Sequence, residues 1–98
     1  MPRPRKCRMI ESGPIKRCYK PNGISMRELN QVVLKNDQLE AIRLADMEQM
    51  DQESAAVQMN ISRPTFSRLV NESRKIVAEA LVNGWALKIE GGDFEVKS

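Results

Sequence analysis

The sequence predicts a mainly α-helical fold, a small helical bundle that contains a helix-turn-helix. Two observations carry this prediction. Of the 98 residues, 41% are hydrophobic but only 4% are aromatic. A modest core of Leu, Ile, Val, Met and Ala suits small helices better than a sheet sandwich. In addition, residues 52–69, QESAAVQMNISRPTFSRL, place the residue types of two helices and a sharp turn in the required order.

Residues 1–20 are expected to form a basic N-terminal arm. Seven cations face the single anion Glu11, which gives this segment +6 and leaves −3 of the net +3 for the rest. Arg-Pro-Arg favours an extended chain, as in arms that reach into a minor groove or follow phosphates. A solubilising tail without fixed structure explains the charge equally well. The arm contacts would be Arg3, Arg5, Lys6 and Arg8.

The helical domain is expected over residues 21–84. After the breaker-rich turn at 19–23, Ser25 and Glu28 form a capping box that predicts a short helix. A support helix should follow from about Asp37 to Met47, where small alanines permit close approach. The apolar residues assigned to the short helix are Leu29, Val32 and Val33.

The helix-turn-helix prediction depends on five positions. Asp51 can cap the helix that begins near residue 52, and Ala56 is small enough for a close helix crossing. Asn60 suits a left-handed turn residue, second only to glycine. Ser62 can cap the next helix, and Pro64 fits within its first turn, where a missing N–H removes no helical hydrogen bond.

The helix after the turn is expected to reach about Val82, with Asn83-Gly84 as a left-handed C-cap. Residues 85–98 are assigned to an extended tail or a short strand, which could pair with residues 15–19. The inward-facing apolar residues of the long helix are predicted to be Phe66, Leu69, Val70, Ile76, Val77, Ala80 and Leu81, while Ile61 points into the core from the turn.

The opposite face of the long helix is basic and polar, which favours DNA binding. Residues near the N-terminus of such a helix enter the major groove, where arginine can pair with guanine through two hydrogen bonds. Solvated charge on an ordinary amphipathic helix is the alternative. The face comprises Arg63, Ser67, Arg68, Asn71, Arg74 and Lys75.

Two family resemblances extend this reading. LEAIRLADME and MDQESAAVQMNISRPTFSRL resemble region four of bacterial sigma factors, although Asn60 replaces the usual turn glycine and Pro64 lies in the reading helix. PRPRKCR, YKPNGI, LEAIRLADME and LVNGWALKIEGG together resemble a small prokaryotic family of uncharacterised, predicted DNA-binding proteins. Some members carry a second domain similar to the dinitrogenase iron–molybdenum cofactor-binding fold. This chain ends at Ser98 without it, so no metallocluster role is expected.

The resemblance implies a set of DNA contacts in three groups. Arg63 and Arg68 would contact bases or adjacent phosphates, whereas Arg74 and Lys75 would contact phosphates only. Residues facing the groove would be Ser62, Arg63, Pro64, Ser67 and Arg68. Those nearer the backbone would be Asn71, Arg74 and Lys75, with Thr65 between the two groups.

The expected function is that of a transcriptional regulator that binds double-stranded DNA as a homodimer, since one unit reads only a few base pairs. The alternative is a protein-interaction module in which the sigma-like fold contacts RNA polymerase or a partner regulator. An enzyme is not expected, because the chain has no histidine, no phosphate-binding glycine loop and no paired carboxylates in an evident pocket.

No cofactor or metal is expected. Cys7 and Cys18 are the only cysteines, and without histidine one chain cannot supply the usual four Cys and His ligands of zinc. Free thiols are the simplest expectation, and a metal or disulfide shared between two chains is the alternative. The sequence has neither a membrane-length apolar run nor a secretory signal, so a cytoplasmic location is expected.

Overall fold

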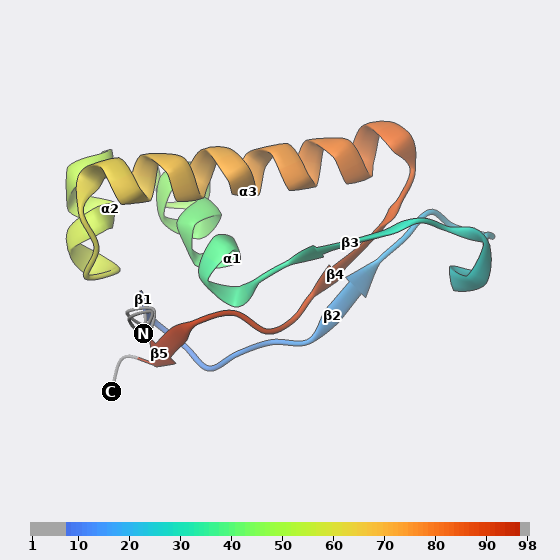
Figure 1. Ribbon diagram of the computed structural model, residues 1–98, viewed down its shortest axis with the longest axis horizontal. Helices are drawn as coiled ribbons and strands as arrows, with labels where there is room; N and C mark the ends of the chain where they lie inside the picture. The colour runs from blue at the N-terminus through green and yellow to red at the C-terminus, as the bar shows by residue number, and fades with distance from the viewer. Residues whose placement is uncertain (1–7, 97–98) are drawn as a thin grey trace, which may run out of the picture.

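The computed structural model describes residues 8–96 and shows a mixed α/β protein, not the mainly α fold that the sequence predicted (Figure 1). The long helix α3 runs along one side of the molecule, and a small sheet runs along the other, with α1 between them. In chain order the elements are β1 (Arg8–Ile10), β2 (Arg17–Tyr19), η1 (Met26–Glu28), β3 (Gln31–Leu34), α1 (Asn36–Ile42), η2 (Arg43–Met47), α2 (Gln52–Gln58), α3 (Arg63–Asn83), β4 (Ala86–Ile89) and β5 (Phe94–Val96).

Strand pairing between distant segments accounts for the difference in fold class. β4 is the central strand of a three-stranded sheet, antiparallel to β2 and parallel to β3. β1 and β5 pair in parallel as a second, two-stranded sheet. The segments assigned to a basic arm and a C-terminal tail therefore meet in the same sheets. The expected short strand after residue 85 is present, and its possible pairing with residues 15–19 is confirmed.

The prediction of a helix after Ser25 is wrong beyond the first turn. Ser25 does cap a helical turn, accepting a hydrogen bond from the Arg27 N–H, but this turn is the short 3-10 helix η1. Val32 and Val33 instead lie in β3, where they pair with β4. Exposure alternates along this strand, from exposed Val33 to buried Leu34, as the two-residue period of a strand requires.

The support helix lies where the sequence placed it, but it changes geometry partway. α1 continues directly into the π-helical turn η2, which ends at Met47. Arg43, at this junction, binds Glu40 (Nε–Oε1 2.6 Å) and Glu11 (Nη2–Oε2 2.8 Å). These carboxylates, chiefly through the hydrogen bond to Glu40, raise the pKa of Arg43 above its usual value. The ion pairs tie the loop after β1 to the support helix.

The main core lies where α1, α2 and the first half of α3 meet. Small alanines allow close approach, and Phe66 fills the centre with no exposed surface. Leu81 was expected to face inward but is 77% exposed. Each helical residue turns about 100°, so the residue after buried Ala80 lies at the edge of the packed face. The buried members of this core are Ala41, Leu44, Ala55, Ala56, Met59, Phe66, Leu69 and Val70.

Candidate nucleic-acid interface

Asp51 fixes the start of α2. Its carboxylate accepts hydrogen bonds from the Ser54 N–H (2.8 Å) and the Ser54 hydroxyl (3.0 Å), as the sequence predicted for a helix cap. The backbone hydrogen bond from Ser54 is the main reason why the pKa of Asp51 is lowered. With its pKa lowered, Asp51 is ionised at neutral pH, so the start of this helix carries a negative charge.

The connection from α2 to α3 has the local geometry that its residues indicated. Asn60 adopts a positive φ of 57°, the left-handed conformation expected at this position. The Ile61 N–H donates to the Ala56 carbonyl (3.0 Å), which closes the end of α2. Ile61 is half-buried and packs against the core next to fully buried Met59. The turn is therefore anchored on one side by the core.

The start of α3 is capped and exposed. The Ser62 hydroxyl accepts from the Thr65 N–H (3.3 Å) and donates to Oγ1 of Thr65 (2.9 Å). Pro64 lies within the first turn, as expected. Phe66 and Leu69 are buried from the same turns of the helix. Because Phe66 and Leu69 hold one side of α3 in the core, the opposite side of these turns faces solvent.

Most of the predicted contact residues gather on this exposed side. Arg63 and Arg68 are exposed, and no carboxylate among residues 8–96 lies within ion-pair distance of either guanidinium. Thr65 and Ser67 are half-buried. The group thus offers two unpaired guanidinium groups flanked by hydroxyls and an amide. Its exposed members are Ser62, Arg63, Pro64, Arg68 and Asn71.

Arg74 and Lys75, further along α3, already contact acids. Arg74 makes a two-point ion pair with Asp46 of η2, with Nε–Oδ2 and Nη2–Oδ1 distances of 3.1 and 2.7 Å. This pairing lowers the pKa of Asp46 and raises that of Arg74, in both cases chiefly through their hydrogen bonds. Lys75 lies 3.8 Å from Glu79. The sequence did not reveal Asp46 as a partner because it is 28 residues away from Arg74.

Arg8, assigned to the arm, is turned into the protein. Its guanidinium binds Asp37, a carboxylate with 1% exposure whose Oδ1 has no hydrogen-bond partner among the described residues. Gly92 passes so close to Asp37 that an added Cβ would lie 2.5 Å from Oδ1, and its φ of 109° also favours glycine. Arg8 therefore has a structural role, because its ion pair joins β1 to the start of α1. Arg3, Arg5 and Lys6 lie outside the described residues.

The remaining predictions concern the two cysteines, metal binding and membrane-spanning segments. Cys18 is an exposed free thiol whose Sγ lies 3.7 Å from Sδ of Met26, and Cys7 lies outside the described residues. Within residues 8–96, no three side chains of Cys, Asp, Glu or His are grouped closely enough to hold a metal ion. No helix in that part of the chain is both long and apolar enough to cross a membrane.

The fold and this surface define a small mixed α/β protein with an exposed cationic helix start. The family described as "Protein of unknown function DUF134" matches residues 1–97, and the chain belongs to this family. No solved structure matches the chain significantly.

Bacterial relatives agree with this assignment. A UPF0251 protein from Thermoanaerobacter pseudethanolicus is 50% identical over 96 residues, which are 98% of this chain and 81% of the relative. A UPF0251 protein from Pelotomaculum thermopropionicum is 52% identical over 96 residues, 98% of this chain and 73% of the relative. One from Rhodospirillum rubrum is 53% identical over 92 residues, 94% of this chain and 64% of the relative.

Proposed function

We propose that the protein binds double-stranded DNA and regulates transcription, with α2 and α3 acting as a helix-turn-helix similar to that of sigma region four. The observation that carries this proposal is the exposed start of α3. Arg63 and Arg68 lie there without carboxylate partners in the described chain, on a helix whose opposite side is locked in the core. A helix that is anchored in the core and carries free arginines at its N-terminal end suits base recognition in a major groove.

The contacts divide by accessibility. Arg63 and Arg68 are assigned to bases or adjacent phosphates, with Ser67 and Asn71 beside them. Lys75 is 78% exposed and is assigned to a phosphate, since its contact with Glu79 is long. Arg74 would have to leave Asp46 before it reached a phosphate, so its expected contribution is the smallest of the four cations.

The position of β1 supports a role for the basic arm. The Met9 N–H donates to the Met59 carbonyl (3.1 Å), so the strand β1, within the segment predicted as an arm, lies against the end of α2. The cations at positions 3, 5 and 6 therefore precede a point close to the proposed reading helix. Their phosphate contacts would make DNA binding strongly dependent on salt.

Selection from a random duplex pool at two salt concentrations tests the proposal. The protein should enrich one sequence motif, and Arg63→Ala/Arg68→Ala should lose that enrichment. Arg27→Ala/Lys16→Ala is the control, because it removes two exposed cations away from α3. Enrichment that survives in the arginine variant, or that the control loses equally, contradicts the assignment. The spacing of half-sites in the motif would also test the proposed homodimer.

Single replacements separate base contacts from phosphate contacts. Arg63→Ala should weaken binding to the preferred sequence by about 1–3 kcal/mol and relax base preference at one position. Lys75→Ala should weaken binding to every sequence alike and lower the salt slope by about one ion. Equal losses for Arg63→Ala on selected and random DNA would exclude base readout by this arginine.

A protein-interaction module remains a second candidate because one end of α3 exposes apolar residues. Leu81 and Val82 are 77% and 84% exposed, more than a helix packed on a sheet usually leaves uncovered. RNA polymerase or a partner regulator would be the target. Binding of purified RNA polymerase that persists in high salt, with no duplex binding at low salt, would favour this candidate over DNA binding.

A further inference from the structure

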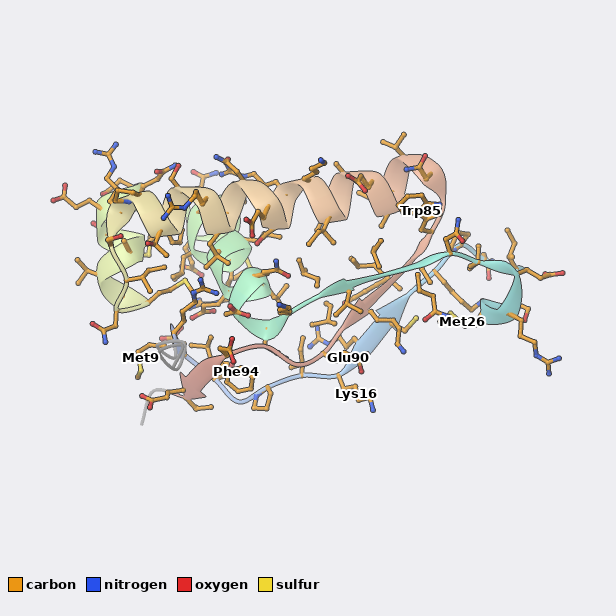
Figure 2. All side chains as sticks on the ribbon, in the orientation of Figure 1. Met9, Lys16, Met26, Trp85, Glu90 and Phe94 are labelled. Carbon is orange, nitrogen blue, oxygen red and sulfur yellow. The ribbon has the colours of Figure 1, made fainter. Side chains whose placement is uncertain are left out.

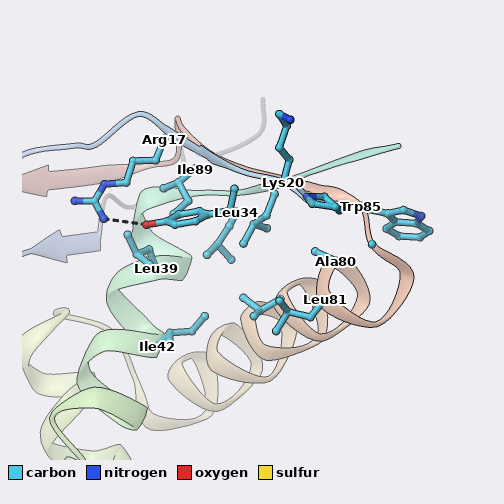
Figure 3. A pocket seen from close by; sticks show the side chains of 14 residues that line it. Arg17, Lys20, Leu34, Leu39, Ile42, Ala80, Leu81, Trp85 and Ile89 are labelled. Carbon is cyan, nitrogen blue, oxygen red and sulfur yellow. Dashed lines mark hydrogen bonds between the residues drawn. The ribbon is translucent and has the colours of Figure 1, made fainter. Parts of the chain in front are cut away.

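A cavity in the described part of the protein lies between α3 and the three-stranded sheet, away from the proposed DNA-reading residues. Its volume is about 510 Å3, within the range of small-molecule sites. Leu39 and Ile42 of α1 form one wall, and Ala80 and Leu81 of α3 form another (Figure 3). No Asp or Glu side chain lines it, and most of the lining is aliphatic or aromatic.

Two polar groups from β2 meet at one end of this apolar space. Arg17 Nη1 donates to the Tyr19 hydroxyl at 3.4 Å, shown as a dashed line in Figure 3. The Tyr19 hydroxyl hydrogen and the remaining Arg17 N–H groups have no acceptor among the described side chains. No described carboxylate lies within ion-pair distance of Arg17. This end of the cavity therefore presents several hydrogen-bond donors without an acid to neutralise them.

Lys20 adds a second positive charge to the same lining. Its Nζ donates to the Ile24 carbonyl (2.7 Å), which holds the side chain without neutralising it. The register of the sheet explains the grouping. Arg17 and Tyr19 pair with Ile89 and Leu87, so both pairs share the face of the sheet that lines the cavity.

We infer that this cavity binds a small monocarboxylate with an apolar body, such as a medium-chain alkyl acid. The aliphatic walls would cover the hydrocarbon part, while Arg17 and the Tyr19 hydroxyl donate to the carboxylate and Lys20 adds attraction. A neutral apolar molecule would leave these donors unused, and a cation would be repelled. The inference does not depend on DNA binding, since it rests on a different surface of the protein.

Titration with octanoate tests the inference on the full chain. The only tryptophan, Trp85, lines the cavity, so its fluorescence should change saturably with octanoate. Octanol and octylamine have the same chain length and should bind at least about tenfold more weakly, as expected when a charge-assisted contact is lost or reversed. Acetate, which lacks the apolar body, should have no effect. Equal binding of octanol and octanoate, or no binding of octanoate, overturns the inference.

Charge variants locate the carboxylate. Arg17→Gln and Lys20→Gln should each weaken octanoate about threefold, and the double variant about tenfold, as expected for partly exposed ion pairs. Lys16→Gln is the matched control, because Lys16 does not line the cavity and is drawn on the side of β2 away from α3 in Figure 2. An equal effect of Lys16→Gln would mean general charge attraction and would overturn the proposed site.

A blocking variant locates the apolar body. Val77→Phe fills part of the cavity from α3 and should abolish the fluorescence response to octanoate, provided that its melting curve shows a folded protein. Octanoate should also raise the melting temperature of the unmodified protein but not that of Val77→Phe. If Val77→Phe fails to fold, the charge variants above decide the question, since they alter exposed side chains only.

Discussion

At its N-terminal end α3 packs against two other helices, and at its C-terminal end it passes over a cavity. Phe66 and Val70 have no exposed surface, and the two free arginines lie on the outer side of the same turns. Near the other end, Val77 and Leu81 line the cavity, and Leu81 and Val82 are largely exposed. One helix therefore has a tightly packed polar end and a loosely packed apolar end.

This difference indicates that packing and surface chemistry are matched along α3. Base recognition benefits from a rigid helix, and the dense core behind Arg63 and Arg68 fixes the backbone that carries them. A ligand site or a protein contact needs apolar surface that the fold itself has not covered, and the end around Leu81 retains such surface. The predictions that follow test this contrast.

Truncation of a core residue should have the largest effect. Phe66→Ala removes the central side chain of the packed end and should lower the free energy of unfolding by about 3–5 kcal/mol. Val77→Ala, at the cavity, should cost less than about 1.5 kcal/mol, because part of its side chain already lacks packing partners. Urea denaturation of both variants measures the difference, and equal losses would contradict the contrast in packing.

The turn residue should have the next largest effect. Asn60→Val forces a β-branched residue into the left-handed region and should destabilise the protein by about 1–2 kcal/mol. Asn60→Gly should leave stability unchanged or slightly higher, since glycine adopts this conformation freely. Thermal unfolding checks both. A loss in Asn60→Gly as large as in Asn60→Val would assign the effect to the amide side chain and not to the backbone.

Removal of the Asp46 charge should have a smaller effect on stability and a visible one on DNA. The Arg74–Asp46 pair is nearly half exposed, so Asp46→Asn should cost less than about 1 kcal/mol at neutral pH. The freed guanidinium should strengthen binding to duplexes of any sequence, measured by fluorescence anisotropy. Glu53→Gln is the control, because it removes an exposed charge from α2.

The same pair gives a pH dependence of known sign. The pKa of Asp46 is lowered in the folded protein, chiefly by the hydrogen bond from Arg74. Its stabilising contribution is therefore complete above the pKa of the unfolded carboxyl, about 3.9, and is lost as the pH falls through the folded value. The stability difference between the unmodified protein and Asp46→Asn should be present at pH 7 and diminish as the pH falls below the pKa of the unfolded carboxyl. A difference that persists in acid would rule out the ionised pair as its source.

Replacement of the exposed apolar residues should change the stability of the monomer least. Leu81→Ser/Val82→Ser should alter the free energy of unfolding by no more than about 0.5 kcal/mol in dilute solution. If the proposed homodimer forms through the C-terminal end of α3, the same variant should weaken self-association at least about tenfold, measured by sedimentation. Val57→Ser, at an equally exposed site on α2, is the control.

Signals that act over a few residues made the α2–α3 region predictable. Asp51 and Ser62 cap the helices that directly follow them, and Asn60 and Gly84 adopt the left-handed conformations that their residue types favour. Each of these effects depends on neighbours within about four residues, so the sequence contains the necessary information. The exposed cationic side of α3 followed from the same local pattern.

Apart from the pairing of residues 15–19 with the strand after residue 85, features that depend on distant partners were not predicted. Val32 and Val33 read as helical residues because β4, their partner strand, lies more than 50 residues later. Asp46 gave no sign of its pairing with Arg74, and Arg8 resembled the other arm cations although Asp37 holds it inside. The cavity is lined by residues of β2, β3, α1, α3 and β4, so no single stretch of sequence could indicate it.

The pairing of β1 with β5 has a consequence for the order of folding. Arg8 is paired with Phe94, so this sheet closes a loop that spans nearly the whole chain, whereas the contacts of α2 with α3 join near neighbours. Local contacts form faster than those that close long loops. During synthesis the core around Phe66 can therefore assemble while β1 still lacks its partner strand. The proposed DNA-reading helix α3 would therefore be in place before β1 pairs with β5.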